Sequence, residues 1–406
     1  MSVYLGIDWS EQKHDVCFMN EAGAVIQFLT VAHSVNGFAQ LDQAIRALGL
    51  PAADVYIGLE TAHTLLIDFM LERGYPHLYV LPPSQVKANQ DRFAQSHAKD
   101  DQRDGWVLAD MLRTDRGRYR PWQPDTRLTR QIQVQVRYVL YLNRMIRRQT
   151  NHLRALLLRY YPLAAELFSK LDSPIALAFL QAYPTPQAAQ HLSPSQFEAF
   201  LREHRHPQRA KWAALYAALT GPQLVPHPDT VALYAQQAPL LAEQLATFVC
   251  AKPQAVRVLR QLFDQHPQAG LFGSLPRVGD FLAPALLAKL GDDPQRFASP
   301  AAVQAIAGTC PITQRSGKHR AVLFRHACDR EFRYIATLWA GQVIAHHPWA
   351  QTLYAQYRKR GISETDATRR VANRLLAILW KVWQSHTPYN EATHLQNRLA
   401  RARPRG

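Results

Sequence analysis

The sequence predicts an α/β N-terminal domain followed by mostly α-helical domains. Up to residue 85, short apolar runs of β-type composition alternate with segments of helical spacing, which is typical of a sheet covered by helices. From residue 127 to 159, and again beyond residue 275, apolar residues recur at helical spacing. A chain of 406 residues is also longer than one typical domain. We therefore expect a first domain over 1–124, a helical or coiled-coil arm over 125–268, a C-terminal domain over 269–390 and a basic tail over 391–406.

The first domain is expected to combine strands with helices. The expected strands are apolar runs at Val3–Asp8, Asp15–Met19, Ala24–Ala32, Val55–Glu60 and His77–Leu81. The expected helices are Phe38–Leu48, Leu65–Arg73 and Ala94–Asp115. Gly74 marks the end of the second of these helices, because glycine commonly follows a helix C-terminus.

Most of the chain after residue 125 is expected to be helical. Residues 160–270 are predicted to form helices cut by prolines, and further helices are expected up to Leu290, up to Gly308 and near 330–346, 349–360 and 364–385. We expect a loop around Ser316 and a mobile basic tail. Core positions are expected for Trp339, Trp349, Trp380 and Trp383.

Charge is distributed unevenly along the chain. Residues 1–116 hold 9 Lys/Arg and 15 Asp/Glu, a balance of 9 − 15 = −6, and the rest hold 38 and 16, a balance of 38 − 16 = +22. A large basic surface favours a polyanionic partner, because neutralising phosphates releases counterions. The charge therefore indicates nucleic acid, and the alternative is a cationic protein without such a partner.

The segment from Arg127 to Arg159 carries eight arginines and no Asp, Glu or Lys. A roughly heptad apolar stripe runs along it, at Val136, Val139, Leu142, Ile146, Leu153 and Leu157. Because no internal ion pairs offset the repulsion between the arginines, we favour a helix that faces phosphates. Its expected nucleic-acid contacts are Arg137, Arg144, Arg147 and Arg148. The alternative is a helix packed against a partner, with its arginines in solvent.

Several features exclude a membrane or secreted protein. No run of eighteen apolar residues occurs, and the N-terminus has no basic segment of the kind that opens a signal peptide. The four cysteines, at 17, 250, 310 and 328, form no close pair, which fits a reducing compartment. We therefore expect a cytoplasmic protein.

Four carboxylates are candidates for a metal site. Asp8 and Glu60 end predicted strands, where side chains enter the crevice in which α/β sheets bind ligands. Asp101 and Asp104 lie three residues apart on a predicted helix and share one side of it, although Asp100 is close enough to replace Asp101. Clustered carboxylates repel each other unless a cation neutralises them, and their hard oxygens suit Mg²⁺ or Mn²⁺. The alternative is that all four are helix-capping or surface acids.

Three segments resemble the motifs of the DEDD transposases of insertion sequences, a family that includes the Piv-type invertases. They are Gly6-Ile7-Asp8-Trp9-Ser10, Gly58-Leu59-Glu60-Thr61-Ala62 and Lys99-Asp100-Asp101-Gln102-Arg103-Asp104. The resemblance implies an N-terminal domain similar to the RuvC resolvases, with a ribonuclease-H-like fold. It also implies that Asp8, Glu60, Asp101 and Asp104 form the catalytic, metal-binding tetrad, because the K-x-D-x-x-D pattern selects Asp101 over Asp100.

A second constellation surrounds Ser316. Gly317 follows it, and Arg315, Lys318 and Arg320 could attract a phosphate and stabilise charge in its transition state. On local sequence alone Ser316 is a turn serine, since only His319 nearby could act as its base. The family resemblance instead implies that Ser316 is the DNA nucleophile. Leu275-Pro276-Arg277-Val278-Gly279 resembles the family's Pro-Gly-x-Gly hairpin between helices, with Arg277 in place of the usual first glycine, and we expect Arg277 and Gly279 to contact a phosphate.

The resemblance implies a mechanism and partners. Ser316 would attack a DNA phosphodiester, forming a phosphoserine link and a free 3′-hydroxyl, and the bond would later be rejoined to another strand. The metal site and the serine would come from different subunits of a homo-oligomer, a dimer or tetramer with composite active sites. An element-encoded structured noncoding RNA would pair with target and donor DNA.

Three alternatives remain at this stage. A RuvC-like structure-selective endonuclease would use the four acids and water, and would not need Ser316. A sugar kinase or actin-like ATPase also begins with Gly-Ile-Asp, but it needs later glycine-rich phosphate loops that the sequence lacks. A catalytically inactive nucleic-acid scaffold is disfavoured by the complete acidic set.

Overall fold

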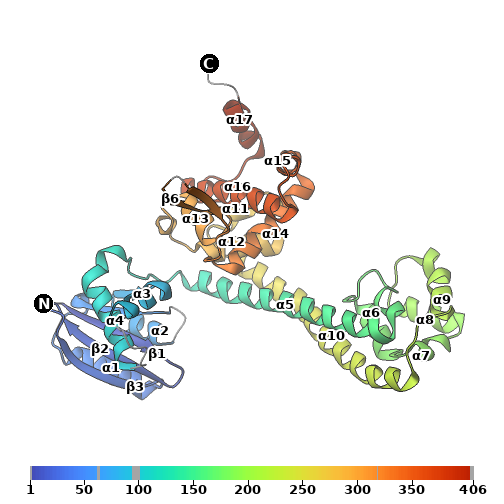
Figure 1. Cartoon of the computed structure of the whole chain (residues 1–406), viewed down its shortest axis with the longest axis horizontal. Coiled ribbons are helices and arrows are strands. Elements are labelled where there is room, and N and C mark those ends of the chain that lie inside the picture. Colours follow the sequence, from blue (N-terminus) through green and yellow to red (C-terminus); the bar gives the residue numbers. More distant parts are fainter. Residues whose placement is uncertain (1, 62–64, 94–100, 318, 403–406) are drawn as a thin grey trace. The chain divides into compact units, whose positions relative to one another are not determined.

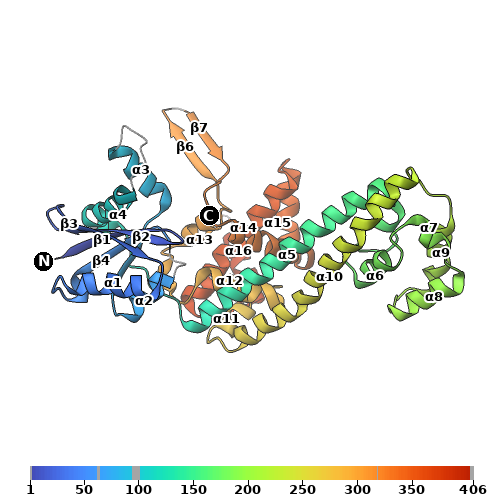
Figure 2. The ribbon, with the colours of Figure 1, turned by 90° about the horizontal axis from the view of Figure 1, so that it is seen from below.

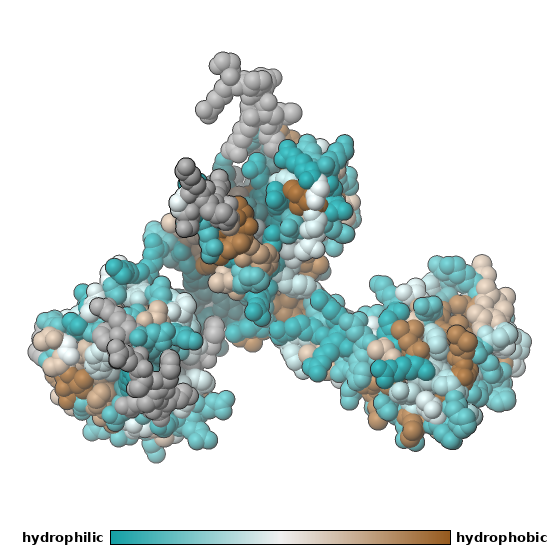
Figure 3. All heavy atoms as spheres, viewed as in Figure 1, coloured by the Kyte–Doolittle hydropathy of each residue, from teal (hydrophilic) through white to brown (hydrophobic). Residues whose placement is uncertain are grey.

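The computed structural model describes residues 2–61, 65–93, 101–317 and 319–402. It divides into two compact units, Met1–Pro124 and Asp125–Gly406, with separate hydrophobic cores. Hydrophilic side chains cover most of the face drawn in Figure 3, and apolar side chains gather there in small groups. Throughout the described ranges, every helix is too short or too polar to cross a lipid bilayer.

The first unit is built on a mixed five-stranded sheet in the order β3-β2-β1-β4-β5. The strands are β1 (Val3–Trp9), β2 (Lys13–Asn20), β3 (Val25–Ala32), β4 (Val55–Leu59) and β5 (His77–Val80). β1, β4 and β5 run parallel to one another, whereas β2 is antiparallel to β1 and β3. The central strand β1 is buried along most of its length, as its apolar composition predicts. All five predicted strands are confirmed.

Helices cover both faces of this sheet (Figure 2). One face carries α1 (Val35–Arg46) and α2 (Leu65–Glu72), and the other carries α3 (Pro83–Phe93) and α4 (Asp101–Asp115). The expected helix over 94–115 is confirmed from Asp101 onward, and residues 94–100 lie outside the described residues. Helix α3 was not predicted, because Pro82-Pro83 suggested the end of an element. Proline is tolerated in the first turn of a helix, where its missing N–H would have no partner.

The second unit begins with two long antiparallel helices, α5 (Arg127–Tyr160) and α10 (Pro228–Asp264), which lie side by side in Figure 1. At one end they pack with α6 (Pro174–Ala182), α8 (Pro194–Glu203) and α9 (Trp212–Thr220) around a separate core, beside the short α7 (Pro186–Gln190). At the other end they join the core of the C-terminal helices. The expectation that prolines divide this region is confirmed, because helices begin at Pro174, Pro186, Pro194 and Pro228. Pro239 and Pro253, in contrast, lie inside α10. The buried face of α10 against α5 offsets the lost backbone hydrogen bonds.

The C-terminal part of this unit is a helical bundle with one hairpin. Its helices are α11 (Ala269–Gly273), α12 (Gly279–Leu290), α13 (Pro300–Ile306), α14 (Arg330–His346), α15 (Pro348–Lys359), α16 (Glu364–Ser385) and α17 (Glu391–Ala402). Trp339, Trp349 and Trp383 are buried and Trp380 packs against them, so their predicted core positions are confirmed. The basic tail is helical as far as Ala402, where α17 ends, and its mobility stays a prediction.

The loop expected around Ser316 is instead a β-hairpin. Strands β6 (Ile312–Ser316) and β7 (His319–Leu323) pair antiparallel and stand out from the helices of their own unit in Figure 2. The sequence Thr-Gln-Arg-Ser is polar and lacks the alternation of a half-buried strand, which explains the wrong prediction. Gly317 adopts a φ of 55°, the left-handed region that glycine accommodates without steric cost and that a tight hairpin requires.

A buried histidine makes the first unit sensitive to acid. His14, on β2, is completely buried, and its Nε2 lies 2.9 Å from Nδ1 of His33. The pKa of His14 is lowered from 6.5 to about 4, first by burial and second by the neighbouring His33, while Asp15 acts in the opposite direction. Between these two pH values the unfolded chain binds a proton at this position that the folded chain rejects. The folded state therefore loses stability as the pH falls through this window.

We expect His14→Phe to weaken that acid sensitivity. The wild-type protein should lose up to about 3 kcal/mol from this residue between pH 7 and pH 4, whereas phenylalanine has no proton to bind. Urea unfolding at pH 7, 5.5 and 4.5 measures the difference. Parallel pH profiles for the wild type and the variant would show that His14 does not carry the effect.

Candidate functional site

Asp8 and Glu60 reach the same edge of the sheet. β1 and β4 pair in parallel, with Ile7 opposite Leu59 as the last registered pair. Asp8 and Glu60 directly follow these two residues, so the parallel register brings them to one end of neighbouring strands. This is the carboxyl end of the parallel strands, the position at which α/β sheets bind ligands.

Helix α4 lies on this part of the sheet at very short range. A Cβ atom added to Gly6 of β1 would come within 1.9 Å of the Gly105 carbonyl oxygen. The absence of side chains at both glycines therefore permits direct contact between the helix and strand backbones. That contact fixes Asp104, the residue before Gly105, close to the strand ends.

Glu60 and Asp104 interact electrostatically. Partial burial raises the pKa of the Glu60 carboxyl above its usual value, and the negative charge of Asp104 raises it further. Asp104 is half-buried, and its Oδ1 accepts a hydrogen bond of 2.7 Å from Nε2 of Gln90 on α3. The Gln90 carbonyl in turn accepts a hydrogen bond from Arg103 at 3.2 Å. The repulsion between the Glu60 and Asp104 carboxylates is relieved when one of them is protonated or when a cation binds beside them.

Two residues near these acids were missed by the sequence analysis. Gln90 was missed because helix α3 was not predicted. Asp15 lies directly opposite Asp8 in the β1–β2 pair, and it is buried. Its carboxylate accepts a 2.5 Å hydrogen bond from Thr30 and pairs with Lys13 at 3.1 Å. The sequence did contain a signal for Asp15, because this acid directly precedes the apolar run Val16–Met19.

The described side chains form an incomplete cluster. Asp101 begins α4, three residues before Asp104, but its side chain lies outside the described residues, as does the whole of Asp100. Among the side chains that are described, no three Asp, Glu, His or Cys residues lie close enough to hold a metal ion. The structure thus brings together Glu60 and Asp104, and places Asp8 at the same sheet edge.

Ser316 lies at the tip of the β6–β7 hairpin. It is the last residue of β6 and stands opposite His319, and Arg315 stands opposite Arg320. The side chain of Arg315 is exposed, whereas the side chains of Ser316, His319 and Arg320 and the whole of Lys318 lie outside the described residues.

The base of the hairpin packs against arginines of α14 and α16. The ring of Phe324 lies 4.5 Å from the guanidinium carbon of Arg333 and also 4.5 Å from that of Arg369. Arg333 also donates a hydrogen bond to the Arg325 carbonyl. Arg369 pairs with Asp366 at 2.9 Å, so its position is fixed on its own helix. These contacts hold the hairpin to the bundle and leave its tip exposed at Arg315 and Gly317.

The turn before α12 has the backbone geometry of a glycine-rich hairpin. Arg277 has a φ of 56° and Gly279 a φ of 53°, both in the left-handed region. A non-glycine residue in that region costs roughly 1–2 kcal/mol. Arg277, with an exposed side chain, therefore occupies a backbone conformation that glycine would adopt without this cost. Gly279 begins α12, whose first N–H groups lack helical partners.

The arginines of α5 fall into two groups. Arg137 and Arg148 are exposed, and the Nε of Arg137 contacts only the Gln133 carbonyl of its own helix in the hydrogen bonds described. Arg144 pairs with Glu331 of α14 at 3.8 Å, and Arg147 donates to the Tyr334 hydroxyl at 3.1 Å. Arg144 therefore has an acidic partner on another helix, although α5 itself contains no acidic residue, as expected. Glu331 was missed because its contact with α5 spans 187 residues of sequence.

Comparison with known proteins identifies both ends of the chain. Residues 5–162 match a model of DEDD transposases of IS110, described as "Transposase", and residues 269–355 match the model "Transposase IS116/IS110/IS902 family". Together these segments cover nearly all of the sheet unit, α5, and the C-terminal part from α11 into α15 with the hairpin.

Full-length relatives occur in two actinobacteria. The chain is 28% identical over 401 residues to the protein assigned as the mini-circle transposase for IS117 of Streptomyces coelicolor, covering 96% of each chain. It is 26% identical over 406 residues to the uncharacterized 42 kDa protein of insertion element IS900 of Mycobacterium paratuberculosis, covering 96% of this chain and 98% of the relative. With one transposase model over its N-terminal part and another over its C-terminal part, the chain belongs to the IS110 family of DEDD transposases.

Proposed function

We propose that the chain cleaves and rejoins DNA through a covalent phosphoserine at Ser316, with divalent metal held by Asp8, Glu60, Asp101 and Asp104. The observation that carries the proposal is the placement of Glu60 and Asp104 within electrostatic reach of each other, at the sheet edge where Asp8 lies one residue before the end of β1. The IS110 family models over both units support a transposase that uses DNA as substrate.

The sheet supports a ribonuclease-H-like, RuvC-like first unit. Its strand order β3-β2-β1-β4-β5, with β2 antiparallel and β4 and β5 parallel to β1, is the arrangement of that fold. The acids then occupy the end of the central strand, the end of its parallel neighbour and the helix that packs on both.

The donor set fits a hard divalent cation. Carboxylate oxygens are the preferred ligands of Mg²⁺ and Mn²⁺. Burial and the charge of Asp104 raise the pKa of Glu60, and a bound cation would offset both effects. When bound, such an ion would supply electrostatic stabilisation of charge on phosphodiester oxygens. Gln90 would hold Asp104 in position, since it already donates a hydrogen bond to Oδ1.

The hairpin tip would present the nucleophile. The Ser316 oxygen would form a bond to phosphorus as the bond from phosphorus to the 3′-oxygen breaks, and the 3′-oxygen would leave with a proton as a hydroxyl. Arg315, Lys318 and Arg320 would attract the phosphate and stabilise its charge. Gly317 would let the strand backbone approach closely, and the exposed Arg277 with the N-terminus of α12 at Gly279 would hold a neighbouring phosphate. The phosphoserine keeps the bond energy for rejoining to another 3′-hydroxyl.

The exposed arginines of α5 support contact with a structured noncoding guide RNA. Arg137 and Arg148 are open to solvent, and the helix contains no acidic residue that would repel phosphates. Such an RNA would select donor and target DNA by base pairing, whereas the protein would recognise its shape and backbone.

Glu60→Gln tests the acidic site. We expect at least a hundredfold loss of DNA cleavage in the presence of Mg²⁺, because the variant removes one of four proposed ligand charges while keeping the size of the side chain. Glu72→Gln is the matched control, an exposed residue of α2 in the same unit. Single-turnover cleavage of labelled DNA measures both. Equal rates for the wild type and Glu60→Gln would remove Glu60 from the site.

A further inference from the structure

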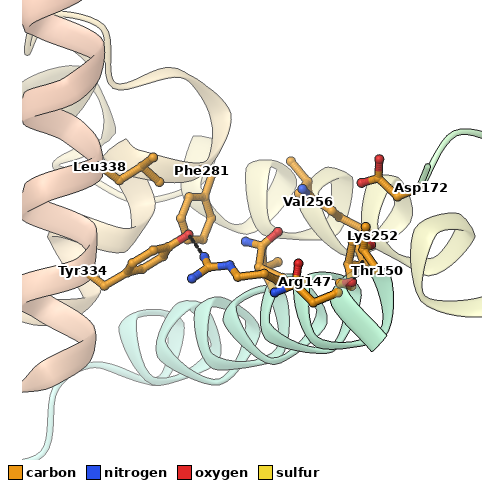
Figure 4. A pocket seen from close by; sticks show the side chains of 12 residues that line it. Arg147, Thr150, Asp172, Lys252, Val256, Phe281, Tyr334 and Leu338 are labelled. Carbon is orange, nitrogen blue, oxygen red and sulfur yellow. Dashed lines mark hydrogen bonds between the residues drawn. The ribbon is translucent and has the colours of Figure 1, made fainter. Parts of the chain in front are cut away.

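A cavity of about 470 Å³ lies within the second unit, between α5, α10, α12 and α14 (Figure 4). This volume is within the range of roughly 300–1,000 Å³ that small-molecule sites occupy. The two ends of the cavity differ in chemistry. Figure 4 shows Phe281, Tyr334 and Leu338 at one end, and Asp172, Lys252 and Thr150 at the other, with Arg147 between them.

The apolar end offers surfaces for a flat ring. Phe281 and Tyr334 are only partly buried, so part of each aromatic side chain remains accessible. The Arg147 guanidinium carbon lies 5.5 Å from the centre of the Tyr334 ring, and its Nη2 donates to the Tyr334 hydroxyl at 3.1 Å. This contact holds a planar cation beside an aromatic ring. Aromatic rings and guanidinium planes are the surfaces on which proteins stack unpaired bases.

The polar end offers hydrogen-bonding groups that the protein leaves unused. Within the described part of the chain, neither Asp172 nor Lys252 forms an ion pair or a side-chain hydrogen bond, although both are half-buried. In the described ranges the half-buried amide of Asn143 also lacks a side-chain hydrogen bond, and the exposed Asn151 lines the cavity as well. Half-buried polar groups without protein partners are suited to a polar ligand, because a ligand can supply the missing hydrogen bonds.

We propose that this cavity binds one unpaired ribonucleotide of an RNA, with the base at the Phe281–Tyr334 end and the ribose near Asp172. This inference rests on the proposed association with RNA and names a specific site for it. The Asp172 carboxylate would give the site its preference for RNA over DNA. It can accept a hydrogen bond from a ribose 2′-hydroxyl, which DNA lacks, and it repels phosphate. Lys252 and Arg147 supply the positive charge for the flanking phosphates.

Asp172→Ala tests the proposed site, because the loss of negative charge and the loss of the hydrogen bond to the ribose should change RNA affinity in opposite directions. The probes are a labelled 12-nucleotide single-stranded RNA of mixed sequence and the DNA of the same sequence, each titrated against the purified full-length chain. Loss of a negative charge should strengthen general binding of nucleic acid slightly. We nevertheless expect RNA affinity to fall about tenfold, because a charge-assisted hydrogen bond to the 2′-hydroxyl is lost, with DNA affinity unchanged or higher.

Two further variants complete the test. Glu198→Ala removes an exposed acid of α8 in the same unit and should leave both affinities unchanged. Phe281→Leu keeps an apolar side chain in the packed bundle but removes the ring, and it should weaken RNA binding at least fivefold through lost stacking. Thermal unfolding of each variant confirms that it is folded.

The outcomes separate this inference from the proposed function. Unchanged RNA affinity in Asp172→Ala overturns the ribonucleotide site, and so does an equal loss of RNA and DNA affinity, which would indicate a deoxynucleotide or a general change in the protein. If the wild-type chain purifies without any discrete RNA but Asp172→Ala still loses its preference for the RNA probe, guidance by RNA is wrong and the ribonucleotide site stands.

Discussion

Ser316→Ala will abolish the covalent protein–DNA product completely. Alanine has no oxygen with which to attack phosphorus, and no other group of the hairpin tip that the sequence offers, Arg315, Gly317, Lys318 or His319, is a hydroxyl. The product is measured by incubating labelled DNA and Mg²⁺ with the RNA-loaded protein and separating the mixture on a denaturing gel. Proteolysis and mass spectrometry then locate the phosphate on the peptide.

Two comparisons make this result specific. Ser195→Ala changes an exposed serine of α8 and should form the product as the wild type does. Bound RNA should be retained by Ser316→Ala, because the serine lies on the hairpin and not on α5. A product that persists without Ser316 would reject it as the nucleophile. Free 5′-phosphate ends made by both proteins, without any protein-linked DNA, would instead favour a resolvase-type nuclease that uses water.

The sheet and the position of its acids could be predicted because local signals agree with one another there. Each strand of the first unit is an apolar run ended by a turn residue, and Asp8 and Glu60 interrupt two such runs at their ends. The contact between α4 and β1 also left a local signal, namely Gly6 and Gly105, but only the structure shows that these two glycines meet. Predicting this contact from the sequence would require knowing which helix packs on β1.

Other features are set by tertiary contacts that have weak local signals. The hairpin around Ser316 has a polar sequence, and it is held by the packing of Phe324 between Arg333 and Arg369. Helix α10 continues through Pro239 and Pro253 because its partner α5 buries one face of it. In both cases packing between distant segments overrides the local preference of the chain.

The proposed metal-binding acids and the proposed nucleophile belong to different units. Asp8, Glu60 and Asp104 lie in Met1–Pro124, and Ser316 lies in Asp125–Gly406. If one copy supplies the acids and another supplies the serine, two inactive variants can complement each other. If both come from one copy, no mixture of single variants restores the site. Glu60→Gln and Ser316→Ala are the two variants required.

We expect an equal mixture of these variants, assembled together, to regain about a quarter of the wild-type covalent product. In a two-fold dimer, half of the mixed molecules contain one variant of each kind, and one of their two sites then combines intact acids with an intact serine. A size tag on the Glu60→Gln copy shows on the gel which copy carries the DNA. The DNA must become attached to the tagged copy, because only that copy retains Ser316. A chain carrying both substitutions, mixed with Glu60→Gln, contains no intact acidic site and should stay inactive. If mixed oligomers form, as shown by co-purification through the tag, and still give no product, the acids and the serine act within one copy and the composite site is wrong.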